Sequence, residues 1–254
     1  MFRWKRRPPP ADPRPLPPSV EGTTSAADSL FEAQRRIWGR DDALTVVDAG
    51  AHHGHTTLQY LDAFPNCRVI ALEPASANHA VAATALAPYG ARVELLQVGL
   101  SDTSSTADLR LTSHSGAHSL LEVGDMRFYD EPVDILPPEP IETVTLDHLC
   151  KQRSIDTLDI LKMDIQGGEL MALKGAQTML ARGAIRLIVL EVLFQPLYKD
   201  QPMFWDLADY LRTHRYALQG IYQLRHHSQN HALLCWADAI FAGPGMTTIP
   251  GNPV

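Results

Sequence analysis

The chain has 254 residues, of which 45% are hydrophobic and 20% are charged, and its formal net charge at pH 7 is −7. A chain of this length can bury one substantial core, so we expect a single domain. The negative balance disfavours a nucleic acid as the main partner, because binding phosphates requires a positively charged surface. A small neutral or polar ligand fits this composition better.

The sequence gives no indication of a membrane span or of a disulfide framework. Its apolar runs are all shorter than the roughly 20 residues that are needed to cross a bilayer. The three cysteines are far apart and lack the spacing of metal ligands: Cys67, Cys150 and Cys235. An odd number of isolated cysteines is typical of a reducing compartment, so we expect a cytoplasmic protein.

The start of the chain differs in composition from the rest. It reads MFRWKRRPPPADPRPLPP, which is basic and rich in proline and lacks the apolar centre of a signal peptide. Such a segment cannot bury enough apolar surface to fold by itself. We therefore predict a disordered tail over residues 1–26, a single domain over 27–243 and a flexible tail over 244–254.

After this tail, the spacing of apolar residues alternates between the helix period and the strand period. The first predicted elements, in chain order, are a helix at 29–39, a strand at 44–48, a helix at 55–64, a strand at 68–73, a helix at 76–87 and a strand at 92–97. This order is typical of a parallel sheet with helices on both faces. Residues 106–112 are expected to form a short edge strand. Residues 112–140 form a long polar loop, and loops of this kind are usually functional or mobile.

The alternation resumes beyond the long loop. The predicted elements are a helix at 145–153, a strand at 158–164, a helix at 168–182, a strand at 185–191 and a helix at 202–215. Two final strands, at 216–224 and 232–242, are separated by the polar stretch HHSQN, which indicates an antiparallel pair at the end of the sheet. We therefore predict an α/β fold, with a doubly wound and mostly parallel sheet.

In such a sheet, ligands bind outside the carboxyl ends of the strands. The first end reads VVDAGAHHGHT, where Asp48 ends the strand and Gly50 and Gly54 bracket a turn. Glycine lets the backbone take positive φ and lets a ligand approach closely. The dinucleotide pattern G-x-G-x-x-G is not met, because His52 and His55 occupy its second and third glycine positions. A pyrophosphate-binding turn is therefore disfavoured.

The next two strand ends carry polar residues that suit a nucleoside. Glu73 ends the second strand, and an acid at this place can accept hydrogen bonds from the hydroxyls of a ribose. Ser101 and Asp102 follow the third strand, where they either meet an adenine edge or form an ordinary turn. A glycine turn, a ribose acid and these polar residues describe a pocket for a nucleoside without phosphates. S-adenosylmethionine is a common ligand of this kind.

Seven stretches of the chain form a characteristic series, in this order: VVDAGAHHGHTTLQYL, VIALEP, LLQVGLSD, VTLDHLC, LDILKMDIQGGELMALKGA, IRLIVLEV and ALLCWADAIFAG. These stretches resemble the successive motifs of the FkbM family of S-adenosylmethionine-dependent methyltransferases. The resemblance implies the class I methyltransferase (Rossmann-like) sheet, with seven strands and the last one antiparallel. It also implies methyl transfer to a hydroxyl oxygen of a sugar, a glycoconjugate or a polyketide-like metabolite. Family members usually carry amides near the first glycine turn, where this chain has His52 and His55, so the pH dependence of cofactor binding is open to change.

Two carboxylates are the leading catalytic candidates. Asp164 follows the fourth parallel strand, where class I folds bring the cofactor methyl group and the acceptor together, and Glu191 ends the neighbouring strand. An alcohol needs a base or a metal ion to become a good nucleophile at neutral pH. The pair could divide the acid and base roles, or it could bind Mg²⁺, as acids at these strand ends do in metal-dependent relatives. Glu169, in the first helical turn that follows, is expected to cap that helix.

Histidines in the long loop offer a second choice of base. His114 and His118 lie in SHSGAHSLLE, and an unperturbed imidazole titrates near pH 6.5. The aromatic residues after Glu191, which include Phe194 and Trp205, would form either a wall for the acceptor or part of the core. Two alternatives to a methyltransferase remain at this stage: an NAD(P)-dependent reductase, and a cofactor-binding relative without activity.

Overall fold

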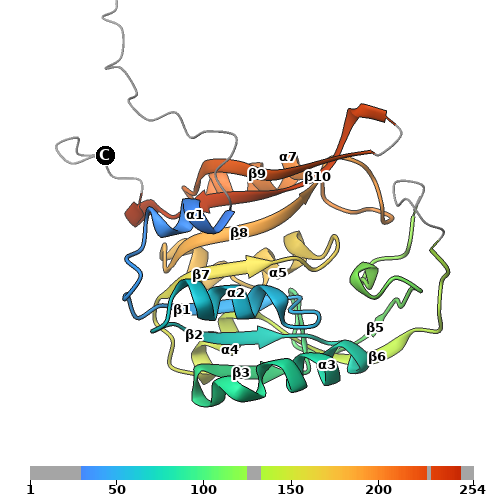
Figure 1. The fold of residues 1–254 in the computed structure, drawn as a ribbon. Helices are drawn as coiled ribbons and strands as arrows, with labels where there is room; N and C mark the ends of the chain where they lie inside the picture. Colours follow the sequence, from blue (N-terminus) through green and yellow to red (C-terminus); the bar gives the residue numbers. More distant parts are fainter. Residues whose placement is uncertain (1–29, 125–132, 228–229, 247–254) are drawn as a thin grey trace, which may run out of the picture.

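The computed structural model describes residues 30–124, 133–227 and 230–246 (Figure 1). The predicted N-terminal tail at 1–26 lies outside these residues, as do positions 247–254 of the predicted C-terminal tail. Residues Pro244–Met246 of that tail form a short 3₁₀ turn, η4. Residues 27–29, 125–132 and 228–229 of the predicted domain also lie outside the described residues.

A seven-stranded sheet forms the centre of the molecule, in the order β3-β2-β1-β7-β8-β10-β9 (Figure 1). Its strands are β1 (Thr45–Ala49), β2 (Arg68–Leu72), β3 (Val93–Leu96), β7 (Leu158–Met163), β8 (Ile185–Leu193), β9 (Ala217–His227) and β10 (Asn230–Ala242). The pairs among β1, β2, β3, β7 and β8 are parallel, whereas β10 runs antiparallel to both β8 and β9. The predicted mostly parallel sheet with an antiparallel last strand is confirmed.

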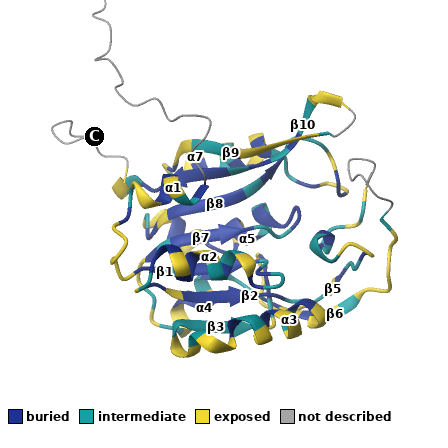
Figure 2. Ribbon diagram, viewed as in Figure 1, coloured by how far each residue is buried: buried dark blue, intermediate teal, exposed yellow. Residues whose placement is uncertain are grey.

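Helices cover both faces of this sheet. One face packs on α1 (Leu30–Arg35), α2 (His55–Ala63) and α3 (Ser76–Leu86), and the other packs on α4 (Leu146–Gln152), α5 (Glu169–Lys174), α6 (Gln177–Ala181) and α7 (Phe204–Thr213). A 3₁₀ segment, η1 (Ala87–Arg92), connects α3 to β3. Figure 2 shows the inner strands as buried and the outer faces of the helices as exposed. Burial on both faces explains why the inner strands contain continuous apolar runs such as VIAL (69–72) and LIVL (187–190).

The pairing register places the ends of three strands side by side. Ala49, at the end of β1, is opposite both Leu72 of β2 and Met163 of β7. The residues that follow these strands therefore share one edge of the sheet. Gly50, Glu73 and Asp164 all lie there, as the sequence predicted.

A second, three-stranded sheet lies beyond this edge, in the order β4-β6-β5 (Figure 1). It consists of β4 (Gly99–Leu100), β5 (Thr106–Leu109) and β6 (Glu139–Val144), and the 3₁₀ turn η2 (Ser115–Ala117) lies in the loop between β5 and β6. The sequence predicted only β5. The strands β4 and β6 were missed because β4 has two residues and because β6, EPIETV, begins next to a proline-rich loop.

One predicted helix was wrong in its extent. Residues 168–182 form two helices, α5 and α6, which are separated at Gly175 and Ala176. At Gly175, a Cβ atom would lie 2.1 Å from the backbone oxygen of Ser101. Gly175 is thus the C-cap of α5, and the end of β4 approaches it so closely that there is no room for a side chain.

The helices of the described residues are all too short or too polar to cross a membrane. Cys67, Cys150 and Cys235 are all buried in the core.

Candidate active site

A cavity of about 240 Å³ lies at the carboxyl edge of the sheet, between the strand ends and residues 112–121, which we call the covering segment. Five predicted site residues line it: Gly50, His52, Glu73, His118 and Asp164. The other predicted residues are not in the lining: Asp48, Gly54, Ser101, Asp102, His114 and Glu191. The cavity therefore gathers residues from four strand ends, and it separates the predicted residues into two groups.

A glycine turn after β1 leaves bare backbone beside Asp164. Gly50 has a φ of 77°, and a Cβ atom built there would lie 1.8 Å from the backbone oxygen of Asp164. Only glycine allows two backbones to approach in this way. Gly54, with a φ of 88°, leads into α2 and packs against Leu86 rather than against the cavity.

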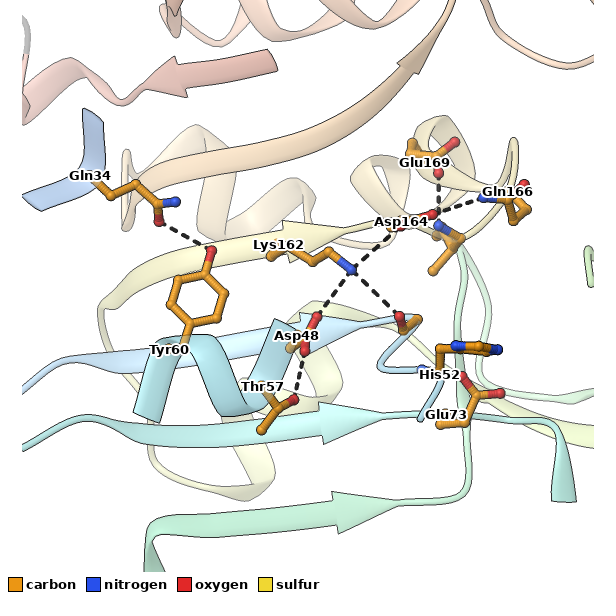
Figure 3. Close-up of polar contacts among 12 residues, drawn as sticks. Gln34, Asp48, His52, Thr57, Tyr60, Glu73, Lys162, Asp164, Gln166 and Glu169 are labelled. Carbon is orange, nitrogen blue, oxygen red and sulfur yellow. Dashed lines mark hydrogen bonds and ion pairs between the residues drawn. The ribbon is translucent and has the colours of Figure 1, made fainter. Parts of the chain in front are cut away.

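Glu73 is held in a fixed orientation by the backbone of two turns. Its Oε2 accepts a hydrogen bond from the His52 N–H at 2.8 Å, and its Oε1 accepts one from the Ala75 N–H at 3.0 Å. Figure 3 shows this carboxylate beside the His52 turn. Burial raises the pKa of Glu73, although both backbone donors act in the opposite direction. The result is an oriented carboxylate at the cavity wall with lone pairs left for hydroxyl groups.

Asp48 has a different place from the one that was predicted for a cofactor ligand. It is fully buried, and its Oδ2 accepts a hydrogen bond from the Thr57 hydroxyl at 2.6 Å. Its Oδ1 lies 3.3 Å from Nζ of Lys162. Asp48 thus acts on the cavity through a neighbour that lines it.

That neighbour, Lys162, is a buried lysine that our sequence analysis did not select. Its ammonium group lies among three oxygen atoms (Figure 3): Asp48 Oδ1 at 3.3 Å, the Gly50 carbonyl at 3.5 Å and Asp164 Oδ2 at 3.8 Å. Burial alone would lower the pKa of Lys162, but the charges of Asp48 and Asp164 outweigh burial and raise it. Lys162 is therefore a fixed positive charge, and its only sequence signal is a lysine within an apolar strand.

Gln166 links the two candidate catalytic carboxylates, and it too was missed. Its amide nitrogen donates to Asp164 Oδ1 and to Glu191 Oε2, at 2.8 Å in each case. Its amide oxygen accepts a hydrogen bond from the Tyr198 hydroxyl at 2.8 Å. The predicted neighbourhood of Asp164 and Glu191 is thus present, with an amide between them.

Glu191 and two acidic residues near it have raised pKa values. The pKa of Glu191 is raised well above its usual value by burial, by the charge of Asp164 and by a hydrogen bond to Asp164. Burial also raises the pKa of Asp238, which is opposite Glu191 on β10, to about 6. Burial raises the pKa of Glu169 to about 7, and Glu169 accepts a hydrogen bond from the Ile165 N–H at 2.9 Å, in the turn before α5.

The space between Asp164 and Glu191 holds hydrogen-bond donors, which do not suit a metal ion. Both carboxylates accept hydrogen bonds from one amide nitrogen, whose N–H groups point to the place where a cation would have to lie. Among the described residues, no group of three or more histidine, cysteine or acidic side chains has the arrangement of metal ligands. The predicted Mg²⁺ therefore finds no matching set of ligands between these two carboxylates.

The two loop histidines occupy different environments. His114 is exposed and does not line the cavity. His118 lines the cavity, and its Nδ1 accepts a hydrogen bond from the Thr112 N–H at 3.2 Å. Burial lowers the pKa of His118. A neutral imidazole whose Nδ1 accepts carries its proton on Nε2, so this ring is a hydrogen-bond donor rather than a base.

Apolar residues occupy the place that was predicted for Ser101 and Asp102. Val98, Gly99 and Leu100 line the cavity after β3. The Ser101 N–H instead donates to the Val144 carbonyl, and the Ser101 backbone packs against Gly175. Neither Ser101 nor Asp102 lines the cavity.

The aromatic residues after β8 lie outside the cavity lining. Phe194 packs on Phe204 with ring centroids 5.4 Å apart, and Phe204 packs on Trp205, whose side chain is 67% exposed. Tyr198 is buried and contacts Gln166. Within the described residues, the alternative of packing therefore accounts for Phe204 and Tyr198, whereas Trp205 remains open to solvent.

Comparison with known proteins agrees with this arrangement. The Methyltransferase FkbM domain matches residues 48–218. The chain is 24% identical over 180 residues to the 2-O-methyltransferase NoeI of Sinorhizobium fredii, which covers 65% of this chain and 70% of NoeI. It is 29% identical over 153 residues to methyltransferase sdnD of Sordaria araneosa, which covers 51% of this chain and 59% of sdnD.

A crystal structure of methyltransferase FkbM from Methylobacillus flagellatus has the same fold, with a TM-score of 0.53 and 19% sequence identity. The similarity covers 84% of this chain but 46% of that chain, so the present chain spans about half of that larger protein. The matched residues 48–218 include the glycine turn, Glu73, Asp164, Gln166 and Glu191. The chain therefore belongs to the FkbM family of S-adenosylmethionine-dependent methyltransferases.

Proposed function

We propose that this chain transfers a methyl group from S-adenosylmethionine to a hydroxyl oxygen of a small molecule, namely a sugar, a glycoconjugate or a polyketide-like metabolite. The observation that carries the proposal is the cavity that joins the Gly50 turn, the oriented Glu73 carboxylate and Asp164 at one edge of the sheet. The name of NoeI, a 2-O-methyltransferase, supports oxygen as the methylated atom. The family membership argues against the reductase that we kept as an alternative.

The residues that line the cavity fit this cofactor. The Glu73 carboxylate would accept hydrogen bonds from the ribose hydroxyls, and Val98 and Leu100 would provide apolar contact for the adenine. Gly50 would allow close approach to the backbone. Asp164, together with the neighbouring acids, would favour the positive charge of the sulfonium group.

When bound, the cofactor supplies a methyl group that is already a strong electrophile, so the chain has to align the acceptor and remove its proton. Asp164 lines the cavity and shares hydrogen bonds with Glu191 through Gln166. The raised pKa of Glu191 makes the pair a better proton acceptor than an ordinary carboxylate. In the proposed reaction, the acceptor O–H proton moves to this pair as the oxygen attacks.

His118 has a supporting part in this proposal. Because its Nδ1 is occupied by the Thr112 N–H, its Nε2–H is available to donate to an oxygen of a ligand in the cavity. It would orient the ligand without accepting its proton. His114 has no assigned part, because it lies outside the cavity lining.

The substitution Asp164→Asn tests the catalytic assignment. It removes the carboxylate that faces the cavity but keeps its shape, so we expect turnover to fall by about 100-fold or more. The affinity for S-adenosylhomocysteine, which carries no sulfonium charge, should stay within about threefold when it is measured by isothermal titration calorimetry. Turnover is read as release of S-adenosylhomocysteine in a screen of sugar and polyketide acceptors, with and without a chelator.

A methylation rate within about threefold of the original would show that Asp164 is not the base. Loss of turnover on adding the chelator would restore the Mg²⁺ hypothesis. A protein that binds S-adenosylmethionine but releases no product with any acceptor would support the relative without activity.

A further inference from the structure

We propose that Gln166, locked in place by Tyr198, is a positioning residue that holds the Asp164 and Glu191 carboxylates together as one unit beside the cavity. This inference rests on the proposed function, because it concerns the pair that would accept the proton. It goes beyond that function by assigning a task to two residues that do not carry out the chemistry themselves.

Both polar atoms of the Gln166 side chain have hydrogen-bond partners. Its two N–H bonds go to Asp164 and Glu191, and its oxygen accepts from Tyr198. The Tyr198 hydroxyl decides which end of the amide faces the carboxylates, because a hydroxyl that donates must meet the amide oxygen. With the amide reversed, the oxygen would face two acids and both N–H donors would be lost to them.

The backbone of Gln166 supports the same conclusion. Its φ is 53°, a left-handed conformation that is strained for a residue with a side chain and that glycine would adopt freely. The covering segment holds this conformation, because the Ser119 hydroxyl donates to the Gln166 carbonyl at 2.6 Å. The strained turn therefore directs the amide toward the two acids.

Tyr198 also connects the unit to the covering segment. Its hydroxyl lies 3.2 Å from the Ala117 carbonyl as well as 2.8 Å from Gln166, and one hydroxyl proton can serve one of the two acceptors at a time. The backbone of Tyr198 is itself anchored, since its N–H and that of Leu197 both donate to the side chain of Gln201 at 2.8 Å. Gln166 and Tyr198 thus connect the segments that follow β7 and β8 to the covering segment.

The charged groups around Glu191 determine how the effect of Gln166 on the two carboxylates can be measured. Lys162 acts on Glu191 from β7, and Asp164 acts on it from the turn that follows β7. Glu169 acts on it from α5 and Asp238 from β10, and Arg225 on β9 acts on Asp238. N–H donors stabilise an ionised carboxylate. Without Gln166, we therefore expect the pair to reach its full negative charge only at higher pH.

S-adenosylmethionine and S-adenosylhomocysteine can report this charge without any acceptor. The first carries a positive sulfonium and the second a neutral thioether, so their affinity ratio reflects the negative charge nearby. We would measure both affinities by calorimetry from pH 5 to 9 in the wild type, in Gln166→Met, in Tyr198→Phe and in the double variant. Tyr216→Phe is the matched control, because Tyr216 is buried and its hydroxyl donates to the Ile185 carbonyl away from the cavity.

In the wild type, the preference for the sulfonium should grow as the pH rises. In Gln166→Met, the pH at which the affinity ratio is halfway through this change should rise by about one unit. Tyr198→Phe should shift it in the same direction by less, the double variant should match Gln166→Met alone, and Tyr216→Phe should leave it unchanged. Tyr198→Phe removes one oxygen atom, so it keeps the test decisive if Gln166→Met does not fold.

A shift below about 0.3 of a pH unit in both single variants, or additive shifts in the double variant, would overturn the inference. Failure of the wild type to bind S-adenosylmethionine would instead overturn the proposed function. The two failures are therefore distinguishable in one set of titrations.

Discussion

At the scale of single residues, the charges buried beside the cavity compensate one another. Asp48 is fully buried, and its Oδ1, which has no hydrogen-bond partner within the described residues, depends on the Lys162 ammonium at 3.3 Å. A buried charge that loses its partner is costly, because neither water nor another ion replaces the lost interaction. Lys162 therefore stabilises the fold as well as the site.

Replacing this lysine should have a large effect on stability. We expect Lys162→Met to lower the free energy of unfolding by about 3–5 kcal/mol, because it leaves the Asp48 carboxylate unpaired. The double variant Asp48→Asn/Lys162→Met should recover at least about half of that loss. Urea denaturation measures both values, and equal losses in the single and double variants would contradict this account.

Glu169 offers a prediction about pH. Its pKa is raised by burial to about 7, so the folded protein binds a proton more tightly than the unfolded chain does. The stability that this proton provides is complete below about pH 4.5 and is lost as the pH rises through 7. Glu169→Gln mimics the protonated form, so its unfolding free energy should rise relative to the wild type between pH 5 and 8, by about 3 kcal/mol at most.

Urea denaturation at several pH values tests this directly. The exposed Glu142 provides the control, and Glu142→Gln should show no such trend with pH. A constant difference between Glu169→Gln and the wild type would mean that Glu169 is ionised across this range.

At the scale of elements, the contact between α5 and the end of β4 depends on a missing side chain. A Cβ atom at Gly175 would lie 2.1 Å from the Ser101 carbonyl, whereas one at Gly245 would meet nothing within 4 Å. Gly175→Ala should therefore lower the free energy of unfolding by about 1–3 kcal/mol through overpacking. Gly245→Ala should change it by less than about 0.5 kcal/mol. Thermal unfolding of the two variants compares them, and similar melting temperatures would show that the backbone at Gly175 can move.

The elements also show what the sequence could and could not predict. The buried strands and their flanking helices were predictable, because long apolar runs and helical spacing are local signals. The close approach between Gly175 and the end of β4, and the two-residue strand β4 itself, were not, since both depend on contact with a distant segment. The same reason applies to the site: Gly50, Glu73 and Asp164 end predictable strands, whereas Lys162 and Gln166 gain their roles from partners up to 114 residues away.

At the scale of the whole molecule, the cavity is lined by the ends of β1, β2, β3 and β7 and by the covering segment, so a ligand that fills it should stabilise the folded chain. A ligand that binds only the folded state adds about 2.7 kcal/mol at 100 times its dissociation constant. S-adenosylmethionine should therefore raise the melting temperature by several degrees. NADH at the same concentration should leave it unchanged, and an equal rise with NADH would return the reductase to consideration.

The position of β10 has a consequence for how the protein is made. This strand is the last in the described chain, yet it lies between β8 and β9 in the sheet. Until the ribosome has released its residues, β8 has an unpaired edge and β9 has no partner to attach it. A nascent chain at this stage exposes backbone groups that can form hydrogen bonds with another molecule. Premature termination before Asn230 would therefore yield an aggregation-prone fragment rather than a shorter enzyme.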